Sequence, residues 1–139
     1  EAKKRNVGII ARVPLASGLL TGKFDTKSTF SSDDHRQFNR KGEAFDQGET
    51  FSGIDYNLGL EALKKLQAIF PEEFELVHIA LKWILMFEEV SCVIPGVSKL
   101  SQLHSNLAAL NIRDLSEQEM EAVEDVYNEM IRPSVHHRW

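Results

Sequence analysis

The fold is decided by residues 7–23, which read VGIIARVPLASGLLTGK. The apolar run at 7–13 does not alternate with polar residues and ends at Pro14, which predicts a strand buried on both faces. A loop of small residues follows and leads to Lys23. A buried parallel strand presents such a loop to a ligand at its carboxyl end. Taken alone, the loop also fits an ordinary strand-to-helix turn, and it lacks the glycine spacing of a Walker or Rossmann loop.

A second strand and loop lie in residues 90–106, where 91–106 read SCVIPGVSKLSQLHSN. The apolar run at 90–94 has the length of a strand and stops at Pro95. Ser98 and Lys99 precede a predicted helix at 100–110, and a helix amino terminus flanked by hydroxyls and a lysine favours an anion. Loops at the carboxyl ends of two parallel strands converge on one side of a sheet or barrel, where barrel enzymes bind ligands.

The remaining patterns are helical. From Tyr56, leucines recur at three-residue steps until Pro71 stops the helix. A second helix is predicted to begin near Glu73, and a last one at the capping-box sequence SEQE (116–119) and to end at Pro133. In the helix at 100–110, the leucines predicted to face inward are Leu103, Leu107 and Leu110.

The order of elements predicts the fold class. It runs strand, long loop, helix, helix, strand, helix, helix, which indicates an α/β fold of parallel strands joined by right-handed crossovers. Residues 23–53 form the long loop, which we expect to be mobile and least ordered from 42 to 53. Within it, Asp33 or Asp34 is predicted to cap a helical turn that reaches Phe38.

Composition narrows the classes of partner. The chain has 139 residues and a net charge of −5, which argues against nucleic acid. It has no apolar run of the ~20 residues that a membrane span needs and no apolar signal core behind its basic amino-terminal residues. The single Cys92 lies in a predicted buried strand, so no disulfide is expected and a cytoplasmic location is predicted. Two strands cannot complete a sheet core, so an amino-terminal half or a second copy is expected to supply further strands.

Four segments together resemble one enzyme family. ARVPLASGLLTGK (11–23) is similar to the seventh-strand segment of bacterial aldo-keto reductases, and ALKWIL (80–85) to their penultimate barrel helix. IPGVS (94–98) with NLAAL (106–110) resembles their eighth strand and cofactor loop, and Leu115, Ser116 and Trp139 resemble the family's usual ending. The resemblance covers essentially all of residues 1–139. It implies the carboxyl-terminal portion of a (β/α)8 barrel, with two parallel strands and about four to five helices.

The resemblance also implies a cofactor, NADP, preferred over NAD, and reduction of an aldehyde or ketone by hydride transfer. Arg12 would lie against the nicotinamide, Lys23 near a phosphate, and Asn106 at the adenine. The 2′-phosphate would be surrounded by Ser98, Lys99 and Gln102. Many relatives have lysine where this chain has Gly96 and arginine where it has Gln102, and these differences weaken the expected selection for the 2′-phosphate. The cofactor-binding residues that we predict are Arg12, Val13, Pro14, Leu15, Ser17, Gly18, Lys23, Gly96, Ser98, Lys99, Gln102 and Asn106.

No catalytic residue is expected in this chain. The family's general-acid tyrosine and the lysine, aspartate and histidine that tune it come from the first half of the barrel. Tyr56 and Tyr127 lack a matching context and are predicted to pack. The pair His136 and His137 has no third ligand in the sequence, so no metal site is predicted. The alternative interpretation is a catalytically silent half-barrel that binds a nucleotide or associates with itself.

Overall fold

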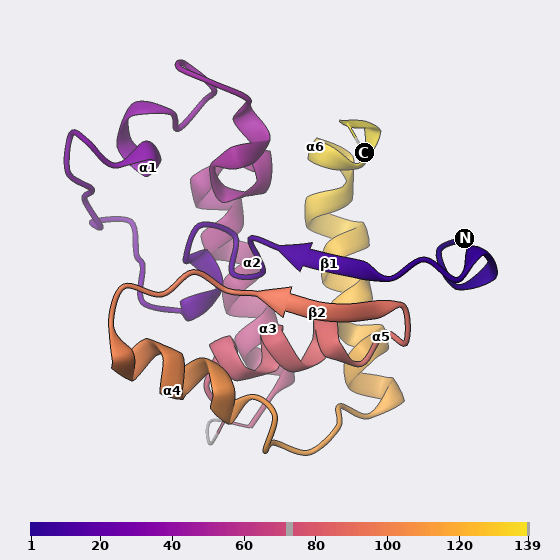
Figure 1. Cartoon of the computed structure of the whole chain (residues 1–139). Helices are drawn as coiled ribbons and strands as arrows, with labels where there is room; N and C mark the ends of the chain where they lie inside the picture. Colours follow the sequence, from indigo (N-terminus) through magenta and orange to yellow (C-terminus); the bar gives the residue numbers. More distant parts are fainter. Residues whose placement is uncertain (72–73, 139) are drawn as a thin grey trace.

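A two-stranded parallel sheet lies across one side of the molecule, with helices behind it (Figure 1). The computed structural model describes residues 1–71 and 74–138. β1 (Ile9–Arg12) pairs with β2 (Val90–Ile94), and the register sets Arg12 opposite Ile94, so that both strands end at the same edge. The predicted strands, their parallel direction and the α/β class are confirmed.

Four longer helices and two short ones accompany the sheet. In the described residues they are α1 (His35–Phe38), α2 (Tyr56–Ile69), α3 (Leu76–Leu85), α4 (Leu100–Ala108), α5 (Glu117–Val126) and α6 (Arg132–Val135). The start predicted near Glu73 lies outside the described residues, and α3 begins at Leu76. No helix in the described ranges is long and apolar enough to cross a membrane.

The core consists of three contiguous clusters that join the helices to the loops. The largest joins α2 to the turn after β1 and to the long loop through Leu19, Phe51, Ile54, Tyr56, Leu60, Leu63 and Val135. A second joins α2, α3 and α5 around Phe70, Ile79 and Leu115. The third joins α3 and α4 to the strands, with Val77, Leu81 and Ala109 packed against Leu15 and Val93. The sheet is therefore held from behind by α3, and its other face is open.

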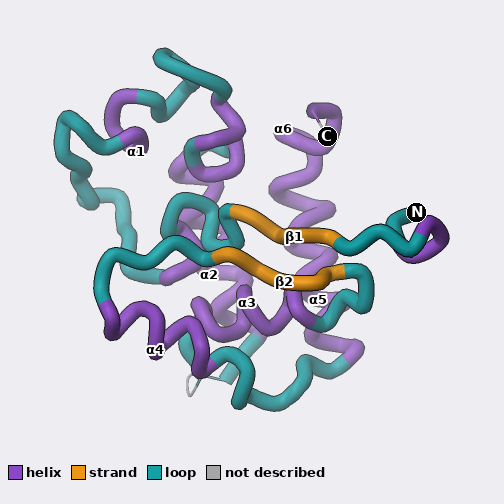
Figure 2. The backbone as a smooth tube through the Cα atoms, viewed as in Figure 1, coloured by secondary structure: helices purple, strands orange, loops and turns teal. Residues whose placement is uncertain are grey.

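The prediction of a strand buried on both faces is wrong. In β1 only Ala11 is partly covered, and Ile10 is 63% exposed. The predicted burial of Cys92 in β2 is wrong for the same reason, because this thiol is exposed. In the described residues each strand has one neighbour, so both outer edges and one face of the sheet have nothing against them (Figure 2). The apolar composition is that of a strand inside a larger sheet.

The inward direction predicted for the α4 leucines is also wrong. Leu103, Leu107 and Leu110 are exposed, while Ala109, on the opposite side, is buried against α3. Spacing correctly predicted which residues share one face of the helix. It could not predict which face the rest of the chain covers, because the cover for the leucines is not among the described residues.

Pro133 does not end the last helix, contrary to prediction. After α5 the chain runs through a π-helical segment, Tyr127–Ile131, and continues as α6, where Pro133 occupies the first turn. Proline lacks an N–H donor, which an α-helix does not need in its first turn. The wider π turn therefore restarts the hydrogen-bond ladder ahead of the proline.

The capping box predicted before α5 is confirmed. The Ser116 hydroxyl accepts a hydrogen bond from the Glu119 amide (3.2 Å), and a Glu119 carboxylate oxygen accepts one from the Ser116 amide (2.7 Å). Arg113 donates to both carboxylate oxygens of Glu119, at 2.7 and 2.6 Å. The Arg113 guanidinium, followed by the bonds from Ser116, lowers the pKa of Glu119 from 4.5 to about 2.

We predict that Glu119→Gln lowers the free energy of unfolding at pH 7 by on the order of 2 kcal/mol. Because the folded-state pKa of Glu119 is depressed, its stabilisation is present above about pH 4.5 and is lost as the pH falls towards 2. Urea titrations between pH 7 and pH 2 measure the difference in free energy of unfolding between the parent and the variant, which should vanish over that interval. Glu121→Gln, at an exposed position of the same helix, is the control, and its free energy of unfolding should equal that of the parent.

Candidate functional site

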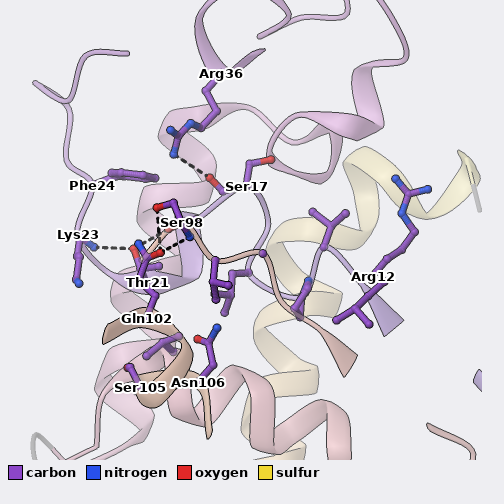
Figure 3. A pocket seen from close by; sticks show the side chains of 18 of the residues that line it. Arg12, Ser17, Thr21, Lys23, Phe24, Arg36, Ser98, Gln102, Ser105 and Asn106 are labelled. Atoms are coloured by element: carbon purple, nitrogen blue, oxygen red, sulfur yellow. Dashed lines mark hydrogen bonds between the residues drawn. The ribbon is translucent and has the colours of Figure 1, made fainter. Parts of the chain in front are cut away.

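The loops that follow β1 and β2 border one open hollow of about 1310 Å³ (Figure 3). The β1 loop supplies Ser17 and Lys23, and the β2 loop and the start of α4 supply Ser98, Gln102 and Asn106. The long loop closes a third side. In Figure 3, Arg12 lies at the opposite end of the hollow from Lys23, so the space is elongated between two cations.

Eleven of the twelve residues predicted from the sequence line this hollow. They are Arg12, Val13, Pro14, Leu15, Ser17, Gly18, Lys23, Gly96, Ser98, Gln102 and Asn106. Lys99 is exposed and does not line it. Whether these residues bind a cofactor stays a prediction.

The β1 loop owes its shape to an unusual backbone. Ala16, Ser17 and Gly18 have φ angles of 47°, 57° and 89°, and Val13 has a φ of 51°. Positive φ is strained for any residue with a side chain, most of all for a β-branched one such as Val13. Such strain persists where the surroundings enforce it, and it concentrates at ligand sites. Ser17 and Gly18 line the hollow, and the amides of Ala16 and Gly18 donate within the turn to the carbonyls of Val13 (3.1 Å) and Leu15 (2.9 Å).

Two hydrogen bonds hold the long loop against Ser17. The Ser17 hydroxyl accepts a hydrogen bond from the Phe51 amide (3.1 Å), and its carbonyl accepts one from Arg36 Nη1 (3.3 Å). Further along, Glu49 forms an ion pair with Arg12 at 3.0 Å. Phe51 is 1% exposed, so this end of the loop is anchored in the core. The mobility predicted for residues 23–53 stays a prediction, but any motion must break these contacts.

Arg36 is engaged within the long loop itself. Its guanidinium pairs with Asp34 (2.5 Å) and lies over the rings of Phe30 and Phe24, 4.5 and 5.4 Å from their centroids. The Arg36 hydrogen bond lowers the pKa of Asp34 from 3.8 to about 2, and the Asp34 carboxylate caps α1, as predicted, by accepting from the Arg36 amide (2.9 Å). The charge of Arg36 is thus already neutralised.

At the start of α4, Gln102 caps its own helix. Its carbonyl oxygen accepts hydrogen bonds from the amides of Ser98 and Lys99 at 2.7 and 3.2 Å, and from the Ser98 hydroxyl at 3.1 Å. This geometry holds the β2 loop against the helix. It also occupies amides that an anion at the amino terminus of a helix would otherwise use.

The ion pairs around the hollow differ from one cation to the next. Arg12 is paired with Glu49, and Arg36 with Asp34. Among the described residues that line the hollow, Lys23 is the cation for which no carboxylate lies within ion-pair distance. An anionic ligand would therefore meet an available positive charge at Lys23. Residues 1–71 and 74–138 contain no cluster of three or more His, Cys, Asp or Glu side chains suited to a metal ion.

Sequence reasoning missed the contribution of the long loop. Phe24, His35, Arg36, Phe45 and Glu49 line the hollow as well. Their positions depend on contacts across the chain, such as the bond from Phe51 to Ser17, which no local pattern encodes. The only available signal was the length and polarity of the loop, which marked it as a candidate for function.

Comparisons with known proteins agree on one family. The model of the Aldo/keto reductase family matches residues 1–128. L-glyceraldehyde 3-phosphate reductase of Escherichia coli O157:H7 is 32% identical over 123 residues, which are 88% of this chain and 34% of that protein. An aldo-keto reductase of Schizosaccharomyces pombe, named with NADP(+), is 23% identical over 80% of this chain and 30% of its own length.

Among solved structures, a glycerol dehydrogenase from Gluconobacter oxydans superposes with a TM-score of 0.72 at 25% identity. The match covers 94% of this chain and 37% of the dehydrogenase. The chain thus spans about a third of the length of the relatives that it matches. The predicted family and its partial-barrel fold are confirmed.

We predict that Asp34→Asn loosens the long loop. The substitution keeps a side-chain oxygen that can still cap α1, but it removes the negative charge that pairs with Arg36, a contact that contributes on the order of 1 kcal/mol. Hydrogen exchange followed by mass spectrometry should show faster exchange in residues 35–40. The neighbouring exposed Asp33→Asn is the matched control. Equal exchange in the two variants would contradict the role assigned to Asp34.

Proposed function

Because the chain belongs to the Aldo/keto reductase family, we propose that it is the cofactor-binding carboxyl-terminal portion of an NADP-dependent reductase of aldehydes or ketones. The observation that carries the proposal is the convergence of two loops, from the same edge of paired parallel strands, on one elongated hollow. Ligands of barrel enzymes bind at that edge. Since the chain spans about a third of its relatives, the activity is proposed for the whole protein.

The residues of the hollow fit a dinucleotide phosphate. A negatively charged ligand suits Lys23, which has no carboxylate partner, and the small residues of the β1 loop let backbone approach a pyrophosphate. When bound, the cofactor supplies the hydride that reduces the carbonyl. In this proposal Arg12, oriented by Glu49, lies against the nicotinamide, and Asn106 contacts the adenine.

The preference for NADP over NAD has narrower support. The S. pombe relative carries NADP(+) in its name. In this chain Ser98 would contact the 2′-phosphate and exposed Lys99 would approach it from outside the hollow, whereas the Gln102 carbonyl is already occupied by its own helix. We therefore propose weak selection for the 2′-phosphate, with NADP still preferred.

The chain alone is proposed to be inactive, because the family's four catalytic residues would come from the amino-terminal portion. Neither tyrosine lines the hollow: the Tyr56 hydroxyl donates to the Asp25 carbonyl (2.8 Å), and the Tyr127 hydroxyl bonds His136 Nδ1 (2.8 Å). A cytoplasmic location remains a prediction from the sequence.

A second candidate function is the catalytically silent half-barrel. The exposed apolar face of the sheet favours it, since such surfaces mark interaction sites. The intact mass of the product of the native gene separates the two. A product near 35 kDa, roughly that of a whole barrel domain, supports the reductase, and one of the size of this chain supports the silent module.

We predict that Lys23→Glu weakens NADPH binding at least about tenfold, because it replaces the uncommitted positive charge of the hollow by a negative one. Calorimetric titration of NADPH into the parent and into each variant measures the dissociation constants. Lys27→Glu, an exposed change in the same loop outside the hollow, is the matched control and should bind as the parent does. Lys99→Glu should have a smaller effect than Lys23→Glu. Equal binding by the Lys23 and Lys27 variants would remove Lys23 from the site.

We also predict that the 139-residue chain alone does not oxidise NADPH in the presence of a panel of aldehydes and ketones. Absorbance of the reduced nicotinamide at saturating cofactor provides the measurement. Turnover that Lys23→Glu abolishes would mean that this chain contains a complete catalytic centre, and the proposed division of the enzyme would be wrong.

A further inference from the structure

Two carboxylate side chains line the hollow in the described part of the chain, and they differ in their partners. Glu49 forms an ion pair with Arg12 at 3.0 Å. Glu75, the residue before α3, is exposed and has no cation within ion-pair distance among the described residues. Its side chain does not cap α3, whereas its backbone carbonyl accepts a hydrogen bond from the His78 amide at 2.9 Å. The first turn of α3 therefore fixes the backbone of Glu75 and leaves its carboxylate available to a ligand.

The packing of α3 on α4 locates Glu75 beside the start of α4. α3 leads into the first residue of β2 and α4 returns from its last, so the two helices run in the same direction (Figure 1). Their register is set by His78 Nε2, which lies 3.2 Å from the Ser105 hydroxyl oxygen. Glu75 precedes His78 by one helical turn, so it lies level with the residues one turn before Ser105, which are Ser101 and Gln102. Both of these also line the hollow.

The start of α4 offers an anion little positive charge to offset this carboxylate. Residues 100–108 contain no Lys or Arg, and Lys99 is exposed and does not line the hollow. The amides of Ser98 and Lys99 already donate hydrogen bonds to Gln102. A phosphate held near Gln102 would therefore meet the charge of Glu75 without a basic side chain of α4 to compensate it.

We infer that Glu75 is a specificity-determining residue that acts against the 2′-phosphate of NADPH and in favour of NADH. A carboxylate accepts a hydrogen bond from the 2′-hydroxyl of the NADH ribose, whereas it repels a 2′-phosphate, which carries nearly two negative charges at pH 8. Glu75 thereby narrows the preference for NADP. The inference rests on the proposed function, in which Ser98 and the start of α4 receive the 2′-phosphate.

The experiment measures the ratio of the dissociation constant of NADH to that of NADPH, by calorimetric titration at pH 8. Glu75→Gln keeps the size of the side chain and removes its charge. Because the carboxylate is exposed, the ratio should rise at least about threefold, chiefly through tighter binding of NADPH. Glu75→Lys reverses the charge and should raise the ratio about tenfold above that of the parent. A purely structural role of Glu75 would weaken the binding of both cofactors and leave the ratio unchanged.

Two variants and a second pair of ligands serve as controls. Glu49→Gln removes the other carboxylate of the hollow, at the end where Arg12 lies, and should change the affinities for both cofactors by the same factor (Figure 3). Glu61→Gln, at an exposed position of α2 outside the hollow, should change neither affinity. Adenosine 2′,5′-bisphosphate and adenosine 5′-monophosphate differ only at the 2′ position, and Glu75→Gln should favour the bisphosphate by a similar factor.

The outcomes separate this inference from the proposed function. If the parent binds both cofactors and Glu75→Gln has the same ratio as the parent, the inference is overturned and the cofactor role stands. An equal rise of the ratio in Glu49→Gln would also overturn it, because the net charge of the hollow would then set the ratio. If neither cofactor binds to the parent, the proposed function is refuted and the inference fails with it.

Discussion

The parallel pairing of β1 with β2 is the constraint on which the rest of the structure depends. The register that sets Arg12 opposite Ile94 brings the carboxyl ends of both strands level, so the loops after them open on the same side. Because parallel strands need a long crossover connection, the long loop, α2 and α3 lie between the two strands in the chain. α3 supports the pair from behind through Val77 and Leu81, which pack against Leu15 and Val93. The hollow exists because these two strand ends are fixed relative to each other.

The long loop is the second determinant of the hollow, and it is ordered by arginine and aromatic contacts. Arg36 lies over Phe24 and Phe30, and Arg40 lies 4.8 Å from the centre of the Tyr56 ring. These stacked contacts join a polar segment to the core without requiring a helix or a strand. Arg36 also pairs with Asp34, and Glu49 of the same loop pairs with Arg12, so Lys23 is, among the described residues that line the hollow, the cation without a carboxylate partner.

The sequence predicted what local chemistry determines. The capping box at Ser116, the cap at Asp34 and both strands appear where their patterns indicate, and eleven of the twelve proposed site residues surround one hollow, because loops after parallel strands must converge. Burial was predicted poorly. Ile10, Cys92 and Leu103 have the character of interior residues, but their neighbours are not among the described residues. The site residues from the long loop were missed because tertiary contacts, not spacing, bring them to the hollow.

The two faces of α4 connect the hollow to an exposed apolar surface. Gln102 and Asn106 on one face line the hollow, and Leu103 and Leu107 on the other face are exposed, within a single rigid helix. A helix with one face unsupported can rotate or shift, since packing of an apolar face supplies most of the stability of a short helix. Any such shift would move Gln102 and Asn106 together with the β2 loop, which Gln102 holds through Ser98 and Lys99. Cover over the leucines would therefore fix the polar residues on the other side of the helix. The hollow and the exposed apolar surface are thus coupled through α4.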